Sequence, residues 1–288
     1  MNSRGPSRTA VRTAMYRAAH YLLDDEPKIL ADLFARLFAG FSTDEELLKT
    51  LADGSWSPVD FPRMRTNFGL RNRYAEDELF QAVQRGVSQY IMLGAGLDSF
   101  AYRRPDFMRT VEVYEVDHPA SQRWKRERVA ELGIETPAKL HYVPIDFEQE
   151  TLAKGLQAGG VNRHARAFFS WLGVIQYLTL EAALQTLREV ARATAPRSEL
   201  VFEFIVPAAT LSRDEGAPVC TLAARAAEVG EPWLSFFEPV DLQTHLRDIE
   251  FGHIFHFGPQ QATERYLLGR TGGLRLPAYF RMIKAGVG

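Results

Sequence analysis

The chain has 288 residues, of which 46% are hydrophobic, and a formal net charge of −2 at pH 7. This length and apolar content allow a substantial buried core and exclude a disordered or fibrous protein. Because the nearly neutral charge provides no basic field for a phosphate backbone, we expect no nucleic-acid partner.

The first 85 residues are predicted to be helical. Apolar residues recur at helical spacing from residue 13 to residue 40, and Pro27 stands where the second helix of a hairpin would begin. Ser42 and Thr43 offer a capping start for a further helix that runs to about Leu51, and residues 75–86 predict another. We therefore expect an N-terminal helical cap or lid over residues 1–85.

The pattern changes at residues 89–93, a short apolar run that enters a glycine turn and is typical of a buried parallel strand. Further strands are predicted near residues 111–116, 139–143, 167–171, 199–206, 250–257 and 278–284. Helices are predicted at residues 119–132, 180–194, 219–229, 238–247 and near 260–268. This alternation predicts an α/β core with a parallel, doubly wound sheet over residues 86–288.

Targeting and redox signals are sparse. Residues 1–12 lack the apolar run of a signal peptide, and no stretch approaches the roughly 20 apolar residues of a membrane span. The single cysteine, Cys220, cannot form an intramolecular disulfide or a thiolate zinc site of the common kind. We therefore expect a cytoplasmic protein without a membrane partner or a metal site.

Two segments of the core predict a nucleotide site. Gly94, Ala95 and Gly96 follow the first core strand, where glycines let the backbone turn tightly and approach a ligand. Glu115 and Asp117 end the next strand, about 20 positions later, which is the spacing that places a carboxylate beside the hydroxyls of a ribose.

The glycine turn favours S-adenosylmethionine over NAD. The sixth position of the dinucleotide pattern is Ser99 and not glycine, and Asp98 would put a negative charge close to a pyrophosphate. An ammonium and a sulfonium group tolerate that charge. After the third strand, Asp146 and Phe147 predict the adenine end, although Asp146 has an alternative interpretation as a helix N-cap.

Several stretches together resemble the leucine carboxyl methyltransferase family, and more closely its bacterial members similar to the polyketide O-methyltransferases. They are residues 16–18 (YRA), 71–77 (RNRYAED), 93–103 (LGAGLDSFAYR), 114–119 (YEVDHP), 146–147 (DF) and 171–178 (WLGVIQYL). The resemblance implies a Rossmann-like class I methyltransferase with seven strands, the last of them antiparallel, and a helical lid over the cofactor. It also implies methyl transfer from S-adenosylmethionine to a carboxylate or phenolic oxygen of a small-molecule acceptor in secondary metabolism.

The same resemblance implies residue roles. Arg71 is the best match to an arginine that binds the methionine carboxylate, for which a bidentate guanidinium is suited, and Arg73 is the competing candidate. Gly94 and Gly96 would face the methionine moiety and Asp117 the ribose, while the adenine end falls to the pair after the third strand.

One departure from the family pattern is Leu172, which stands where many members carry a glutamate. A non-catalytic nucleotide-binding protein on the same fold is therefore one alternative, and an NAD-dependent oxidoreductase is another. A carboxylate acceptor needs no base, whereas a phenol or alcohol does. The catalytic residue stays unassigned, and the candidate bases near strand ends or within strands are His118, His141, Tyr177 and Glu203.

Overall fold

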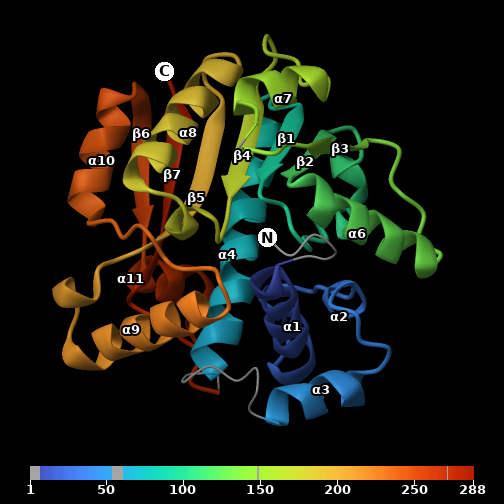
Figure 1. Ribbon diagram of the computed structural model, residues 1–288, viewed down its shortest axis with the longest axis vertical. Coiled ribbons are helices and arrows are strands. Elements are labelled where there is room, and N and C mark those ends of the chain that lie inside the picture. The colour runs from blue at the N-terminus through green and yellow to red at the C-terminus, as the bar shows by residue number, and fades with distance from the viewer. Residues whose placement is uncertain (1–6, 54–60, 148, 271) are drawn as a thin grey trace.

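The computed structural model describes residues 7–53, 61–147, 149–270 and 272–288, and its elements are labelled in Figure 1. Seven strands form one sheet in the order β3-β2-β1-β4-β5-β7-β6. Neighbouring strands are parallel except at β7, which runs antiparallel to both β5 and β6. The strands are β1 (Gln89–Leu93), β2 (Glu112–Asp117), β3 (Leu140–Pro144), β4 (Ala167–Trp171), β5 (Glu199–Ile205), β6 (Phe251–Phe257) and β7 (Phe280–Val287). The predicted doubly wound sheet with an antiparallel last strand is confirmed.

Helices cover both faces of this sheet. Before β1 come α1 (Arg8–Leu23), α2 (Ala35–Phe38), α3 (Asp44–Ala52) and α4 (Phe61–Gln84). After β1 come α5 (Phe100–Arg103), α6 (Pro119–Glu131), α7 (Leu152–Ala158), α8 (Leu180–Ala193), α9 (Arg213–Glu228), α10 (Pro239–Asp248) and α11 (Pro259–Ala262). Short 3-10 turns occupy Asp106–Met108, Ile175–Tyr177 and Ala208–Thr210, and a π-helical turn, Thr263–Leu267, follows α11.

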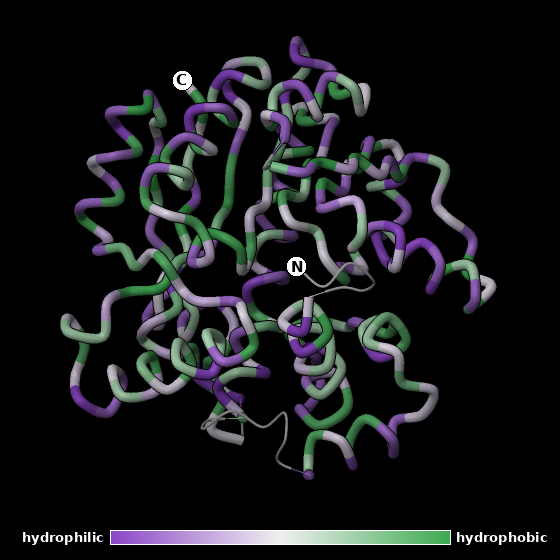
Figure 2. The backbone as a smooth tube through the Cα atoms, in the orientation of Figure 1, coloured by the Kyte–Doolittle hydropathy of each residue, from purple (hydrophilic) through white to green (hydrophobic). Residues whose placement is uncertain are grey.

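The central strands are buried because helices cover them on both sides. Every residue of β1 and β4 is buried, as is all of β5 after its first residue, which is typical of parallel strands between two helical layers. Figure 2 shows that hydrophobic residues predominate along these strands and that the outer helices contain more hydrophilic residues. Helix α4 packs against β4 and β5 on one face, and α7, α8 and α10 border the apolar cluster on the other.

The carboxyl ends of the parallel strands face α1 and α9, which lie below the sheet in Figure 1. Helix α1 packs on α4 and α2, so the elements that precede β1 form a helical layer beside these strand ends. Among the described helices, none is both long and apolar enough to cross a membrane.

The prediction of a second helix beginning at Pro27 is wrong. Residues 24–34 are irregular, although Ile29 and Leu30 are buried, and α2 is only four residues long. The chain turns at Asp32, whose carboxylate accepts a hydrogen bond from the backbone amide of Ala35. Apolar residues at helical spacing can therefore be buried although their segment is irregular, because a polar side chain forms hydrogen bonds with the backbone in place of the helical ones.

Two other helices begin earlier than predicted. The helix expected at residues 75–86 is the carboxyl-terminal part of α4, which has 24 residues. The helix expected at residues 219–229 is part of α9, which begins at Arg213 and contains Pro218. Pro218 lies in the second turn of α9, so its missing N–H removes one backbone hydrogen bond from the helix.

A buried polar network joins the helical layer to the glycine turn. The Asp32 carboxylate accepts hydrogen bonds from Arg17 Nε (2.8 Å) and Ser99 Oγ (2.6 Å), and Arg17 Nη2 also donates to the Leu97 carbonyl (2.6 Å). Burial raises the pKa of Asp32, but the positive charges of Arg17 and Arg103 outweigh it, so the pKa of this carboxyl lies below its usual range. The carboxylate is therefore charged and holds α1 against the loop that follows β1.

We predict that Asp32→Ala lowers the free energy of unfolding by about 3–5 kcal/mol, because it leaves Arg17 as a buried cation without its counter-charge. Urea denaturation measures the effect. Asp106→Ala is the control, since Asp106 pairs with Arg109 at a largely exposed position and should leave the unfolding free energy unchanged. Equal effects of the two substitutions would contradict the importance of the network.

Candidate cofactor site

The candidate site lies at the carboxyl ends of β1, β2 and β4. In open α/β sheets, ligands bind outside the carboxyl ends of the strands, where the strand order reverses. Here the order reverses at β1, because β2 and β3 lie on one side of it and β4 and β5 on the other. The structure places Gly94, Ala95, Gly96 and Asp117 in this region.

The turn after β1 requires glycine. Gly94 has φ +70° and Gly96 has φ +50°, both in the left-handed region that other residues rarely adopt. A Cβ on Gly94 would lie 2.4 Å from Cγ2 of Val174, so the turn touches the loop that follows β4. The backbone amides of Gly94 and Ala95 both donate to the carbonyl oxygen of Val116, which ties the turn to β2. The turn therefore brings the loops of three strands together.

Asp117 holds this turn from the end of β2. Its Oδ2 accepts from the backbone amide of Gly96 (2.5 Å) and its Oδ1 from that of His118 (2.7 Å). Burial raises the pKa of Asp117, while these two N–H groups act in the opposite direction. Each carboxylate oxygen has a further lone pair. The carboxylate can thus accept two more hydrogen bonds, which fits the two hydroxyls of a ribose.

Glu115 lies inside the fold. Its carboxylate is 1% exposed and accepts a hydrogen bond from Lys125 Nζ (2.6 Å), which also donates to the carbonyl oxygen of Asp98 (2.5 Å). Burial raises the pKa of Glu115 to about 7, although the Lys125 charge opposes this shift. Of the two carboxylates that the spacing allowed, Asp117 is the one at the strand end.

Asp146 and Phe147 follow β3 beside Asp117. The backbone amide of Ile145 donates to the Asp117 carbonyl oxygen, which brings the two strand ends together. The alternative in which Asp146 caps a helix is wrong for α7, because α7 begins six residues later, at Leu152, and its N-cap is Thr151. Asp146 is half-buried and Phe147 is 54% exposed. Both residues are therefore accessible at the edge of the site.

Arg71 reaches the other side of the site from α4. Its Nη1 donates to Glu203 Oε2 (2.6 Å), and its guanidinium carbon lies 4.6 Å from the centroid of the Phe68 ring. A Cβ on Gly173, in the loop after β4, would lie 2.7 Å from Arg71 Nη1. Arg71 Nε is buried and has no hydrogen-bond partner among the residues that the structure describes. The guanidinium is therefore fixed in place with a donor left over.

Arg73 points away from the site. Its Nε donates to Asp77 (2.8 Å), its Nη1 donates to the carbonyl oxygen of Ile29, and its side chain is 43% exposed. Between these two arginines, Asn72 Nδ2 donates to Asp98 Oδ2 (2.7 Å) and joins α4 to the glycine turn. The structure thus brings Arg71 to Gly173 in the loop after β4, next to Val174, which meets the glycine turn, and it leaves Arg73 near the surface.

Several buried polar atoms around the site lack a hydrogen-bond partner in the described part of the chain, and such atoms are uncommon in folded proteins. They are Asn67 Oδ1, Arg71 Nε, Asn72 Oδ1, Glu115 Oε1 and Gln176 Oε1. Sequence reasoning did not single out Asn67, Asn72 or Gln176. A signal did exist for Asn67, because it lies four residues before Arg71 and so on the same face of a helix.

The candidate bases have other partners. His118 is the N-cap of α6 and accepts a hydrogen bond from the backbone amide of Ala120 (3.2 Å). His141 pairs with Glu112 (2.8 Å), and Glu203 pairs with Arg71. Three of the four candidates therefore have evident structural roles.

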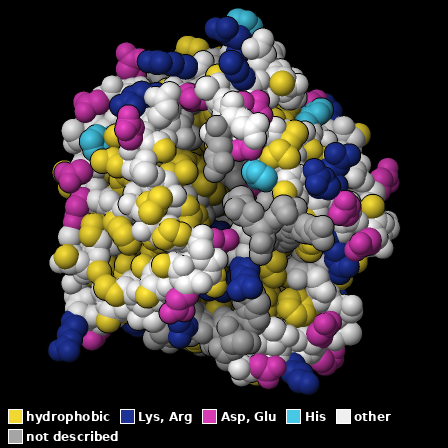
Figure 3. All heavy atoms as spheres, in the orientation of Figure 1, with side chains coloured by type: hydrophobic (Ala, Val, Ile, Leu, Met, Phe, Trp, Pro, Cys, Tyr) yellow, Lys and Arg dark blue, Asp and Glu magenta, His cyan; other side chains and the backbone are white. Residues whose placement is uncertain are grey.

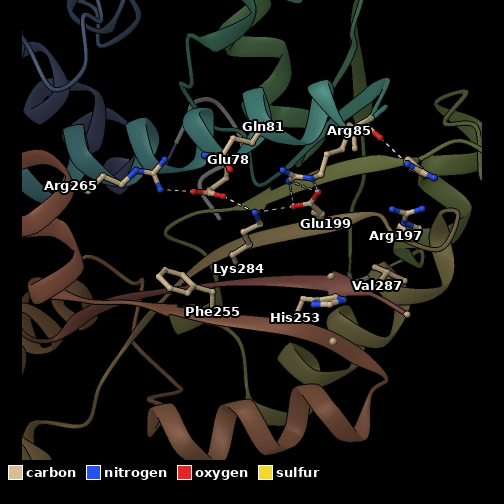
Figure 4. A pocket seen from close by; sticks show the side chains of 15 residues that line it. Glu78, Gln81, Arg85, Arg197, Glu199, His253, Phe255, Arg265, Lys284 and Val287 are labelled. Carbon is tan, nitrogen blue, oxygen red and sulfur yellow. Dashed lines mark hydrogen bonds and ion pairs between the residues drawn. The ribbon is translucent and has the colours of Figure 1, made fainter.

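A cavity of about 800 Å³ lies at the opposite, amino-terminal edge of the sheet and is drawn in Figure 4. Its charged side chains form a chain of ion pairs from Arg265 through Glu78, Lys284 and Glu199 to Arg85. The cavity contains none of the predicted cofactor residues.

At the cofactor edge, Figure 3 shows a hollow near the centre of the face of the molecule that it draws, with hydrophobic side chains gathered to the left of the hollow.

Comparisons with known proteins agree with this geometry. The family model of the leucine carboxyl methyltransferases matches residues 10–191. The chain is 29% identical over 230 residues to a putative S-adenosyl-L-methionine-dependent methyltransferase, YktD, of Bacillus subtilis, which covers 80% of this chain and 73% of that protein. It is also 29% identical over 262 residues to a protein of the same description from Mycobacterium tuberculosis, which covers 89% of this chain and 75% of the relative.

One solved structure, a DUF574 family protein from Streptomyces avermitilis, aligns with 98% of each chain at a TM-score of 0.61. Its sequence identity is 14%, so this likeness shows the fold alone.

We predict that Gly94→Ala abolishes detectable binding of S-adenosylhomocysteine, because its Cβ displaces Val174 and opens the turn. Isothermal titration calorimetry measures the affinity. Gly160→Ala is the matched control: Gly160 also has a positive φ, but a Cβ there meets nothing within 4 Å, so only about 1–2 kcal/mol of backbone strain is expected. Wild-type affinity in Gly94→Ala would show that the turn does not contact the ligand.

Proposed function

Because the chain belongs to the leucine carboxyl methyltransferase family and is an S-adenosylmethionine-dependent methyltransferase, we propose that it methylates an oxygen of a small molecule. The acceptor oxygen is a carboxylate or a phenolic hydroxyl. The description of the family, which names a carboxyl group, supports this assignment. The observation that carries the proposal is that His118, His141 and Glu203 are bonded to other groups. This favours the carboxylate, because a carboxylate acceptor is already deprotonated at neutral pH and needs no base, whereas a phenol does.

We assign the cofactor contacts to residues around the turn after β1. Arg71 holds the methionine carboxylate, and Asp117 accepts hydrogen bonds from the ribose hydroxyls. The backbone of Gly94, Ala95 and Gly96 lies along the methionine moiety, and the adenine end is bordered by Asp146 and Phe147. Glu115 supports the turn through Lys125, which donates to the carbonyl oxygen of Asp98.

The residues present fit this cofactor. The unpaired Nε of Arg71 is a donor suited to a carboxylate, and the Asp117 oxygens retain lone pairs for hydroxyl groups. S-Adenosylmethionine, when bound, supplies an electrophilic methyl group on a sulfonium. The chain's own contribution is to orient the two reactants and to exclude water, effects that are together worth about 7–11 kcal/mol in well-aligned reactions.

The helical layer at the strand ends supports a small acceptor. The hydroxyl of Thr9, in the first turn of α1, donates to Glu231, which follows α9. These two helices therefore meet across the carboxyl edge of the sheet (Figure 1). An acceptor that reaches the cofactor beneath them must be limited in size. We also propose that this helical lid ends at residue 85, that the protein is cytoplasmic and that it acts in secondary metabolism.

The acceptor class is tested by incubating the purified chain with labelled methyl donor and a panel of carboxylic acids, phenols, amines and thiols. We expect label in methyl esters or aryl methyl ethers. S-Adenosylhomocysteine should raise the free energy of unfolding by about 2.7 kcal/mol at a hundredfold excess over its dissociation constant, and NAD should not. Label confined to amines or thiols would overturn the O-methylation proposal, and stabilisation by NAD alone would overturn the cofactor.

We predict that Arg71→Lys weakens binding of S-adenosylhomocysteine about tenfold, or about 1.4 kcal/mol, because an ammonium group cannot reproduce the two-pronged contact with a carboxylate. Adenosine lacks that carboxylate and should bind both proteins equally in calorimetric titrations. Arg73→Lys is the control and should bind both ligands as wild type does. A selective loss in Arg73→Lys would move the assignment to Arg73.

A further inference from the structure

We propose that Glu203 is a positioning residue for the cofactor site, which fixes the Arg71 guanidinium so that its Nε edge is presented to the carboxylate of the bound ligand. The proposal rests on the role of Arg71 given above. It adds a residue on β5, 132 positions away from Arg71 in the sequence, to the functional site.

Glu203 is anomalous in its strand. Every other residue of β5 after the first is apolar, and Glu203 lies between Phe202 and Phe204 and opposite Met282 of β7. Its side chain is 1% exposed. Burial of a carboxylate is costly, and a buried ion pair often stabilises a fold no better than apolar residues of similar volume. The fold alone therefore gives little reason for a carboxylate at this position.

The contacts of Glu203 are directed at α4. Its Oε1 accepts from Asn67 Nδ2 (3.0 Å) and its Oε2 from Arg71 Nη1 (2.6 Å). Asn67 and Arg71 are one helical turn apart, so a single carboxylate spans the face that α4 turns toward β5. Both of its oxygens are used, which fixes the plane of the carboxylate and, through it, the rotamer of Arg71.

The guanidinium is confined on three sides. Glu203 holds Nη1, the ring of Phe68 lies 4.6 Å from the guanidinium carbon, and the space that a Cβ on Gly173 would fill is taken by Nη1. The Nε–H remains buried and without a partner among the described residues. An arginine binds a carboxylate through two parallel N–H groups, and the edge that contains Nε is one such fork. Glu203 thus accepts the hydrogen bond from Nη1 and leaves the edge that contains Nε for a ligand.

The loop after β4 offers no acidic side chain that could replace this contact, because residues 171–175 read WLGVI and the residue before Gly173 is Leu172. Among the described residues, Glu203 is the carboxylate with which Arg71 forms an ion pair. Without it, Arg71 would lose both its counter-charge and the bond that sets its orientation.

The test is Glu203→Gln, which keeps the shape of the side chain and removes its charge. Calorimetric titration compares S-adenosylhomocysteine with 5′-methylthioadenosine, which has the same nucleoside and thioether but lacks the amino and carboxylate groups. We expect the affinity for S-adenosylhomocysteine to fall about tenfold or more, since a hydrogen bond between charged groups is lost, and the affinity for methylthioadenosine to stay unchanged. Equal losses for both ligands, or no loss for either, would overturn the proposal.

Glu78→Gln is the matched control. Glu78 is a buried carboxylate on the same helix and is paired with Lys284 and Arg265 (Figure 4), but it lines the separate cavity, which contains none of the proposed cofactor residues. Its substitution should leave the ratio of the two affinities unchanged. A similar change in that ratio would mean that any disturbance of the packing between α4 and the sheet alters binding, which would overturn a specific role for Glu203.

A double-mutant cycle with Arg71→Lys distinguishes a failure of the Glu203 proposal from a failure of the Arg71 assignment. If Glu203 acts through Arg71, Glu203→Gln should have little further effect on S-adenosylhomocysteine binding once Arg71 is replaced. Additive losses would show that Glu203 acts independently and would overturn the inference alone. No loss in Arg71→Lys would instead overturn the assignment of Arg71. If Glu203→Gln does not fold, Glu203→Asp keeps the charge but shortens the side chain and tests the same alignment, with the same selective loss expected and an unchanged ratio counting against it.

Discussion

The candidate cofactor site depends on one constraint, which is that charges buried at the carboxyl edge of the sheet must be paired. Asp32 holds α1 against the glycine turn through Arg17 and Ser99, and Glu115 supports the same turn through Lys125. The bond between Asp32 and Ser99 joins residues 67 positions apart in the sequence, and the bond between Lys125 and Glu115 joins α6 to β2. Because removing one partner would leave an unpaired buried charge at a cost of several kcal/mol, each pair keeps its two segments together and so fixes the position of the turn.

Much of the fold could be predicted from the sequence because its strands are short apolar runs bounded by turn residues. The run at residues 167–171 coincides with β4, and the run at 89–93 with β1. The prediction of a helix at Pro27 was wrong because the spacing of apolar residues indicates which side chains are buried and not which backbone groups are hydrogen-bonded. In this segment the Asp32 carboxylate accepts a hydrogen bond from the backbone amide of Ala35, and the chain turns. The start of α4 was missed because residues 61–74 contain many polar side chains that are buried by partners elsewhere in the chain.

The candidate site was predictable where its residues are local in sequence. The glycine turn and Asp117 follow from a strand, a turn and a spacing, and the structure brings them into contact through Gly96. Spacing alone did not separate Glu115 from Asp117, because both side chains are acidic and lie on the same face of β2. In the structure Glu115 pairs with Lys125 of α6, whereas Asp117 bonds to the glycine turn. Glu203 could be noticed only as a carboxylate in an apolar strand, because nothing local indicates its partner on α4.

The charged groups that line the cavity at the amino-terminal edge are paired more completely than the polar groups beside the candidate cofactor site, and this difference supports our placement of the ligand. At the amino-terminal edge, the carboxylates of Glu78 and Glu199 each meet two cations, so the charges that line the cavity there neutralise one another. At the carboxyl edge, Asn67, Arg71 and Asn72 each retain a buried atom without a partner in the described residues. Such atoms are costly in an isolated fold and cost nothing when a ligand pairs with them. Because Arg71 offers a donor and the two asparagines offer acceptors, these atoms are complementary to the amino-acid end of S-adenosylmethionine, which has both an anionic and a hydrogen-donating group and which we propose to bind there.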